Sequence, residues 1–183
     1  MKRIALVLLG VLSIPANADG QSAAETIERA LAAAPARSRN EATVIRWNAD
    51  YTYETLKEGS NPMVCYDRTS EARRAPFDVQ CTSLSNLPRV AQNRRFRVES
   101  TDRQSENALI EAAEANGTRV LPEYGSVWIA MRGDDQASAG THTTVAVPGA
   151  TTESTGLPDN GRSGGAWIMA PGTSMAHIMI PGS

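Results

Sequence analysis

The stretch 42–56, ATVIRWNADYTYETL, sets the expected fold. Its two halves, 42–47 and 51–56, are rich in β-branched and aromatic residues, and the polar residues 48–50 separate them. This pattern predicts a β-hairpin. Residues 63–66, MVCY, follow as a short third strand. The sheet is therefore expected to begin with antiparallel neighbours.

Helices are predicted both before and after these strands along the chain. Ser22 and Glu25 have the spacing of a capping box, in which each side chain accepts a hydrogen bond from the other's backbone amide. Two further helices are predicted over 84–98 and 105–115, and Asn116-Gly117 is a typical stop for the second.

The last third of the chain has a β composition. Four short strands are predicted there: 127–131, 143–147, 166–169 and 177–180. The connection 149–165 consists largely of Thr, Ser, Gly and Pro, so we expect a functional or disordered loop that buries no apolar surface. Strands at both ends without a βαβ alternation predict an α+β domain, with a largely antiparallel sheet and two to three helices packed on one face.

The first 18 residues have the pattern of a signal peptide. A cationic start precedes the apolar run 4–14, and Ala16-Asn17-Ala18 provides the small residues of a cleavage site. The apolar run is too short to span a bilayer. We therefore expect one exported domain, 19–183, that is periplasmic or extracellular and has no stable membrane insertion.

The charge balance argues against a nucleic-acid partner. The chain has 18 basic and 20 acidic residues, and loss of Lys2 and Arg3 with the signal peptide would make it more acidic. Nucleic-acid-binding domains are typically basic.

Cys65 and Cys81 are the two cysteines of the chain. In an oxidising compartment they predict a disulfide bond. The alternative, metal ligation by two thiolates, lacks the close spacing of zinc sites.

The last strand presents two faces with different chemistry. Alternation places Met175, His177 and Met179 on one face, and Ile178 and Ile180 on the other as core residues. Thioether and imidazole ligands suit copper. The alternative is that the methionines fill gaps in a core.

His142 precedes another predicted strand. If that strand neighbours the last one, His142 and His177 would share a site with Asp134 or Asp135, as a metal site or an acid–base pair. The alternative is an exposed loop histidine. Ser174 lies in a sequence similar to a nucleophile elbow, but no helix follows it, and no stronger catalytic signature occurs.

The middle of the chain is rich in arginine. Seven arginines lie between 68 and 97, with Glu71 and Asp78 as counter-charges: Arg68, Arg73, Arg74, Arg89, Arg94, Arg95 and Arg97. Such a region can bind an anionic glycan or lipid head group, although a solvated helix face has the same pattern.

The ending resembles a known group of sequences. Trp167-Ile168-Met169, Pro171-Gly172-Thr173 and 177–181 (HIMIP) are similar to the ending of an uncharacterised family of exported bacterial proteins with the motif G-T-x(3)-H-[ILV]-M-[ILV]-P. Gly59-Ser60-Asn61 ahead of Cys65 also resembles this family, although the two residues that follow it depart from the family pattern. The resemblance implies an exported single domain and no particular reaction.

Two functions are consistent with these patterns. The first is a binding module for a small-molecule or anionic ligand or for a metal such as copper, with its site near the C-terminal strand and the 149–165 loop. The alternative is a small metal-dependent or acid–base enzyme that uses His142, His177 and Asp134 or Asp135.

Overall fold

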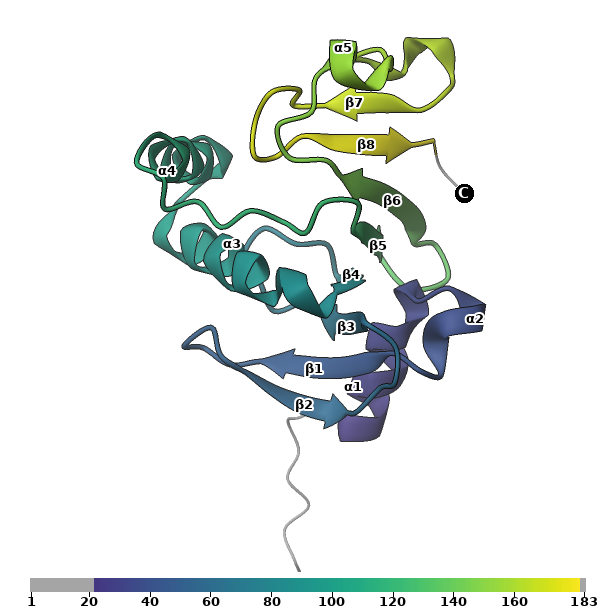
Figure 1. Ribbon diagram of the computed structural model, residues 1–183. Helices are drawn as coiled ribbons and strands as arrows, with labels where there is room; N and C mark the ends of the chain where they lie inside the picture. The colour runs from purple at the N-terminus through teal and green to yellow at the C-terminus, as the bar shows by residue number, and fades with distance from the viewer. Residues whose placement is uncertain (1–21, 182–183) are drawn as a thin grey trace, which may run out of the picture.

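A computed structural model describes residues 22–181, and the predicted signal peptide lies outside them. One eight-stranded sheet in the order β2-β1-β3-β4-β5-β6-β8-β7 runs through the molecule (Figure 1). The strands are β1 (Thr43–Trp47), β2 (Tyr53–Lys57), β3 (Met63–Asp67), β4 (Phe77–Ser83), β5 (Val127–Gly133), β6 (Gly140–Ala146), β7 (Trp167–Met169) and β8 (His177–Ile180). The helices are α1 (Ala23–Ala30), α2 (Ala36–Arg39), α3 (Leu87–Glu99), α4 (Arg103–Ala115) and α5 (Thr152–Thr155), with 3-10 turns η1 (Leu31–Ala33), η2 (Leu84–Asn86) and η3 (Gly161–Ser163). No helix within these residues is long and apolar enough to cross a membrane.

The sheet confirms the predicted α+β class. Neighbouring strands of the described chain run antiparallel, except that β1 and β3 are parallel, with Thr43 opposite Val64. The hairpin over 42–56 is present as β1 and β2. Strand β4 was not predicted, yet it occupies the middle of the sheet between β3 and β5. Its Cys81 lies opposite Cys65 on β3, and the two form the predicted disulfide.

The helices divide between the two faces of the sheet. On one face, α1 and η1 pack their alanines against Cys65, Cys81 and Val79. On the other face, Leu87 and Val90 of α3 pack against strands β1 and β3. Helix α4 lies outside α3, away from the central strands (Figure 1). The sequence predicted helices on one face only. Alternation along a strand shows which residues share a face, but it does not show which helix packs on that face.

The helix ends follow the predicted local signals. The Ser22 amide donates to Glu25 at 2.8 Å and the Glu25 amide donates to the Ser22 hydroxyl at 3.2 Å, which confirms the capping box. Helix α4 ends before Gly117, whose φ of +73° is a left-handed conformation that glycine adopts without strain.

The predicted C-terminal strands are present, and β8 pairs with β6 on one side and β7 on the other. Ile178 packs in a cluster with Val147 and Ile168. Ile180 is 42% exposed, so the prediction of a core residue is wrong there. The residues that cover this face of β8 pack against Ile178 but leave Ile180, at the end of the strand, exposed.

The connection 149–165 has more structure than its composition suggested. It contains α5 and η3, and Leu157 packs into the cluster of Val147 and Ile168. The Gly149 amide donates to the Thr173 carbonyl at 2.8 Å. The expectation that this segment buries no apolar surface is therefore wrong, because one leucine and the backbone hydrogen bonds anchor it.

Candidate functional site

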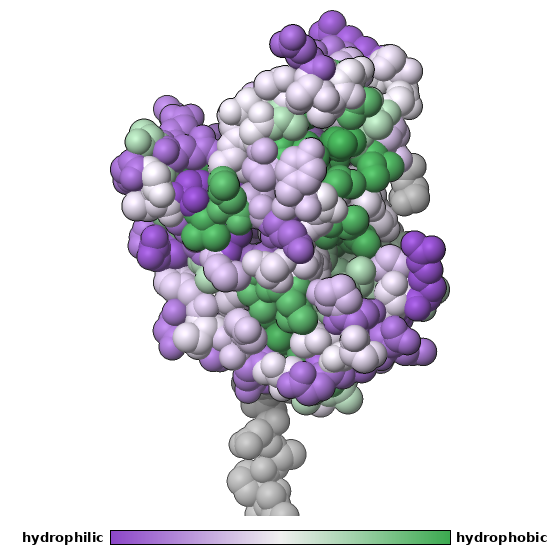
Figure 2. Space-filling model, viewed as in Figure 1, coloured by the Kyte–Doolittle hydropathy of each residue, from purple (hydrophilic) through white to green (hydrophobic). Residues whose placement is uncertain are grey.

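A cavity of about 300 Å³ lies between the sheet and helices α3 and α4. Strands β4, β5, β6 and β8 form its floor, the two helices form its wall, and the segments 119–122 and 174–176 close its ends. An apolar patch lies beside α4, on its side toward the sheet (Figure 2). Two other hollows, of about 520 and 480 Å³, are both lined by Trp47 and contain none of the predicted histidine and methionine residues or Asp134 and Asp135, although Arg94 lines the first.

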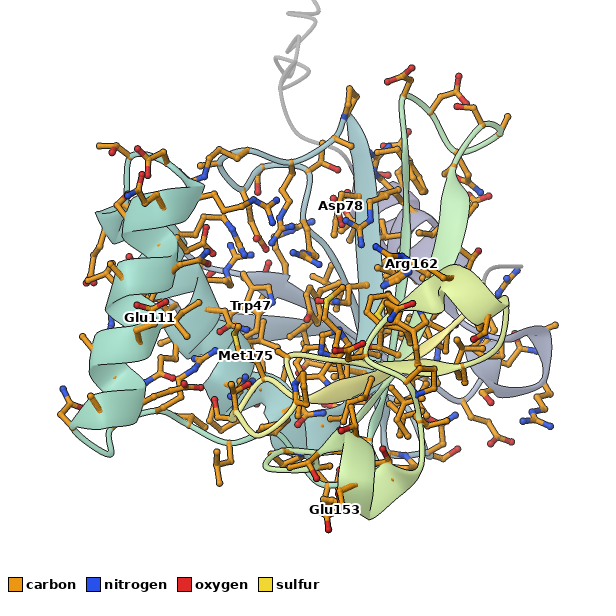
Figure 3. All side chains as sticks on the ribbon, turned by 90° about the horizontal axis from the view of Figure 1, so that it is seen from above. Trp47, Asp78, Glu111, Glu153, Arg162 and Met175 are labelled. Carbon is orange, nitrogen blue, oxygen red and sulfur yellow. A yellow bond between two sulfur atoms is a disulfide. The ribbon has the colours of Figure 1, made fainter. Side chains whose placement is uncertain are left out.

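The C-terminal segment contributes Ser174, Met175 and His177 to this cavity. Met175 lies on the side of the segment that faces the helices (Figure 3). Gly172, with a φ of +79°, and Thr173 turn the chain so that β8 begins at His177. The Gly-Thr pair of the terminal motif therefore shapes the entry into the site.

One nitrogen of His177 is already engaged. Nδ1 lies 2.6 Å from the Met175 carbonyl oxygen. A carbonyl can only accept, so Nδ1 carries the proton and Nε2 is left as the acceptor. His177 therefore offers a single lone pair to a ligand or a metal ion.

The other predicted site residues are not brought together with His177. Ala146 lies opposite His177, so His142 is four residues along the strand, about 13 Å away at roughly 3.3 Å per residue. Asp134 and Asp135 lie in the β5–β6 turn at the other end of the hairpin. Asp135 accepts a hydrogen bond from the Ser138 amide at 2.8 Å, which lowers the pKa of this exposed carboxyl.

Within residues 22–181 no hydrogen bond or ion pair joins His142, His177, Asp134 and Asp135 to one another, and the acid–base enzyme stays a prediction. No group of three or more His, Cys, Asp or Glu residues suited to a metal occurs in the described chain. Met179 lies opposite Thr144 and outside the cavity lining. Burial lowers the pKa of His142, and Arg132 and His177 add to the shift.

Most of the arginine-rich region is engaged inside the protein. Glu71 is the common ion-pair partner of four arginines: Arg68, Arg74, Arg94 and Arg97. The Glu71 side chain is only 5% exposed. Asp78 lies beside this network among nitrogen-tipped side chains (Figure 3), and burial raises its pKa against the opposing effect of Arg68. The network joins the β3–β4 connection to α3.

Arg89 and Arg119 differ from these arginines. Both line the cavity, and they are only 6% and 8% exposed. Within residues 22–181 neither has a carboxylate oxygen within 4.0 Å. Burial lowers the pKa of Arg89 to about 10, with a further contribution from Arg119. Burial also lowers the pKa of Arg119.

Neutral oxygens hold these two guanidinium groups in place. Arg89 donates to the Val120 carbonyl and, at 3.3 Å, to the Ser174 carbonyl. Arg119 donates to Gln92 Oε1 at 2.6 Å and to Asn93 Oδ1 at 2.7 Å.

Sequence reasoning missed Arg119 and its partners. It lies after the helix stop in a stretch without periodicity, and no local pattern marks it as buried. Arg89 was included, but only as one of seven arginines. The connection 149–165 contributes no side chain to the lining of this cavity.

No family model, curated protein or solved structure matches this chain. The resemblance to an exported bacterial family stays a prediction.

Proposed function

We propose that this chain is a small-molecule-binding module whose site is the cavity between the sheet, α3 and α4. The observation that carries the proposal is the burial of two polar side chains from distant parts of the sequence, Arg89 and Arg119, around one hollow that half-buried His177 also lines. Small-molecule sites typically have volumes of about 300–1,000 Å³ and combine apolar walls with a few placed polar groups. Trp128 and Ile110 provide apolar surface here.

The same proposal includes a setting outside the cytoplasm. A fully buried disulfide supports it, because structural disulfides are common in oxidising compartments. The signal-peptide pattern of the first 18 residues supports it as well.

A screen against a filled cavity tests the proposal. Ile110 lies on α4 and lines the cavity, so Ile110→Trp should fill part of it. Glu111→Trp is the matched control, because Glu111 is exposed on the same helix and lies outside the lining (Figure 3).

The measurement is the melting temperature in the presence of a diverse set of small acids, amides, alcohols and sugars. We expect some compounds to stabilise the wild type and Glu111→Trp, but not Ile110→Trp. A set in which no compound stabilises the wild type, or in which Ile110→Trp responds like the wild type, would contradict a ligand site in this cavity.

A further inference from the structure

We infer that the ligand of this cavity is a compact organic anion whose carboxylate or phosphate oxygens bind between Arg89 and Arg119. This inference rests on the proposed function and adds the chemical class of the ligand. The other arginines that line the cavity form ion pairs with carboxylates. Arg89 and Arg119 do not, which is why we choose these two.

The first step is the uncompensated charge. A charged group inside a protein is costly unless an opposite charge accompanies it. Arg97, which lines the same cavity, has Glu71 and Glu106 as partners. Arg89 and Arg119 are more buried and have only carbonyl and amide oxygens, which accept hydrogen bonds but carry no full negative charge.

One carboxylate acts on both groups without forming an ion pair with them. Glu114 opposes the lowering of the pKa of both arginines, but it forms no ion pair with either. Its Oε1 accepts the hydroxyl hydrogen bond of Ser174 instead. Glu114 keeps its charge in this hydrogen bond, but it is not among the residues that line the cavity, and the lining has four arginines against one carboxylate, that of Glu106.

The second step is the free donor. The Nε of Arg119 is buried and has no hydrogen-bond partner in the structure. Guanidinium groups bind carboxylate and phosphate oxygens through paired N–H donors. Since Gln92 and Asn93 already fix the Arg119 side chain, an anion would bind with little loss of side-chain entropy.

The third step is the apolar remainder of the cavity. Trp128, Ile110 and Pro122 line it together with the arginines. A ligand with a charged group at one end and an apolar body at the other would match both parts. The volume of about 300 Å³ lies at the lower end of small-molecule sites, which favours a compact acid.

Four probes separate the charge from the shape of the ligand. Benzoate and phenyl phosphate carry the two anionic groups on the same ring, benzamide is the neutral counterpart of benzoate, and inorganic phosphate lacks the apolar body. Binding to the purified protein is measured by calorimetry at low salt. We expect benzoate or phenyl phosphate to bind, benzamide to bind at least roughly tenfold more weakly, and the stronger of the two anions to identify its head group.

Variants place the binding at the arginines. Arg119→Gln should weaken anion binding roughly 10- to 100-fold, as expected for the loss of charge-assisted hydrogen bonds. Arg119→Lys should retain part of it, because the charge remains but the planar fork is lost. Arg162→Gln is the control, since Arg162 is exposed and lies outside the cavity lining (Figure 3).

The outcomes distinguish this inference from the proposed function. If benzamide binds as tightly as benzoate and Ile110→Trp abolishes both, the cavity binds small molecules but the anionic class is wrong. If the anions bind Ile110→Trp or Arg119→Gln as they bind the wild type, they bind elsewhere and the inference fails. Absence of binding by both aromatic anions at millimolar concentration also overturns it. The comparison of benzoate with benzamide on the wild type holds even if Arg119→Gln does not fold.

Discussion

Replacing Glu71 with glutamine should destabilise the protein strongly. The Glu71 side chain is 5% exposed and is the carboxylate shared by four arginines, with Arg74 Nε at 3.3 Å and Arg68 Nε at 3.7 Å. Glutamine keeps the shape but removes the negative charge, so four guanidinium groups lose a common partner. Loss of one partner from a buried ion pair costs about 3–5 kcal/mol. That is a large part of a typical unfolding free energy of about 5–15 kcal/mol.

The assay is urea and thermal unfolding followed by circular dichroism, with the disulfide intact. For a chain of this size the loss corresponds to a fall in melting temperature of roughly 6–20 °C. Glu54→Gln is the control, because the Glu54–Arg46 pair at 2.9 Å is half exposed and should contribute less than about 1 kcal/mol. A loss below about 1 kcal/mol in Glu71→Gln would refute the reasoning, since water would then be satisfying the arginines.

Three further predictions concern single residues. Because the folded state raises the pKa of Asp78, its contribution to stability is greatest below the unfolded pKa of about 3.9 and is lost as pH rises through the folded pKa. The melting temperature of Asp78→Asn should therefore rise relative to that of the wild type as the pH increases from acidic to neutral. A difference that does not change with pH would contradict this. Cys65→Ser should lower the unfolding free energy by about 2–4 kcal/mol, and non-reducing mass analysis of the wild type should find no free thiol. His177→Ala should lower the unfolding free energy by about 1 kcal/mol, because the hydrogen bond to the Met175 carbonyl is lost. If Met175, His177 and Met179 bind copper, the variant should also lose Cu(I) uptake, and unchanged uptake in a titration would contradict copper binding.

Local signals in the sequence predicted much of the fold. The capping box at Ser22 and Glu25, the hairpin over 42–56 and the glycine stop after α4 each depend on residues within a few positions of one another. The short strands β6 and β8 were also predicted, from their composition. Such features need no knowledge of distant contacts.

The missed features depend on contacts between distant segments. Strand β4 alternates polar residues, Asp78 and Gln80, with apolar ones, and its polar residues are covered only because arginines and Tyr66 reach them. The burial of Arg119 depends on Gln92 and Asn93, which lie 27 and 26 positions earlier. The sequence therefore indicated the C-terminal part of the cavity lining and included Arg89 among seven arginines, but it did not indicate Arg119.

The packing of α1 and η1 over the disulfide limits the states in which it can form. Cys65 and Cys81 are both 0% exposed, and Ala30 and Ala34 pack in the cluster that encloses them. An oxidant can reach the thiols only while this face of the sheet is open. Oxidation of Cys65 and Cys81 therefore requires a state in which α1 and η1 are not packed over this face of the sheet.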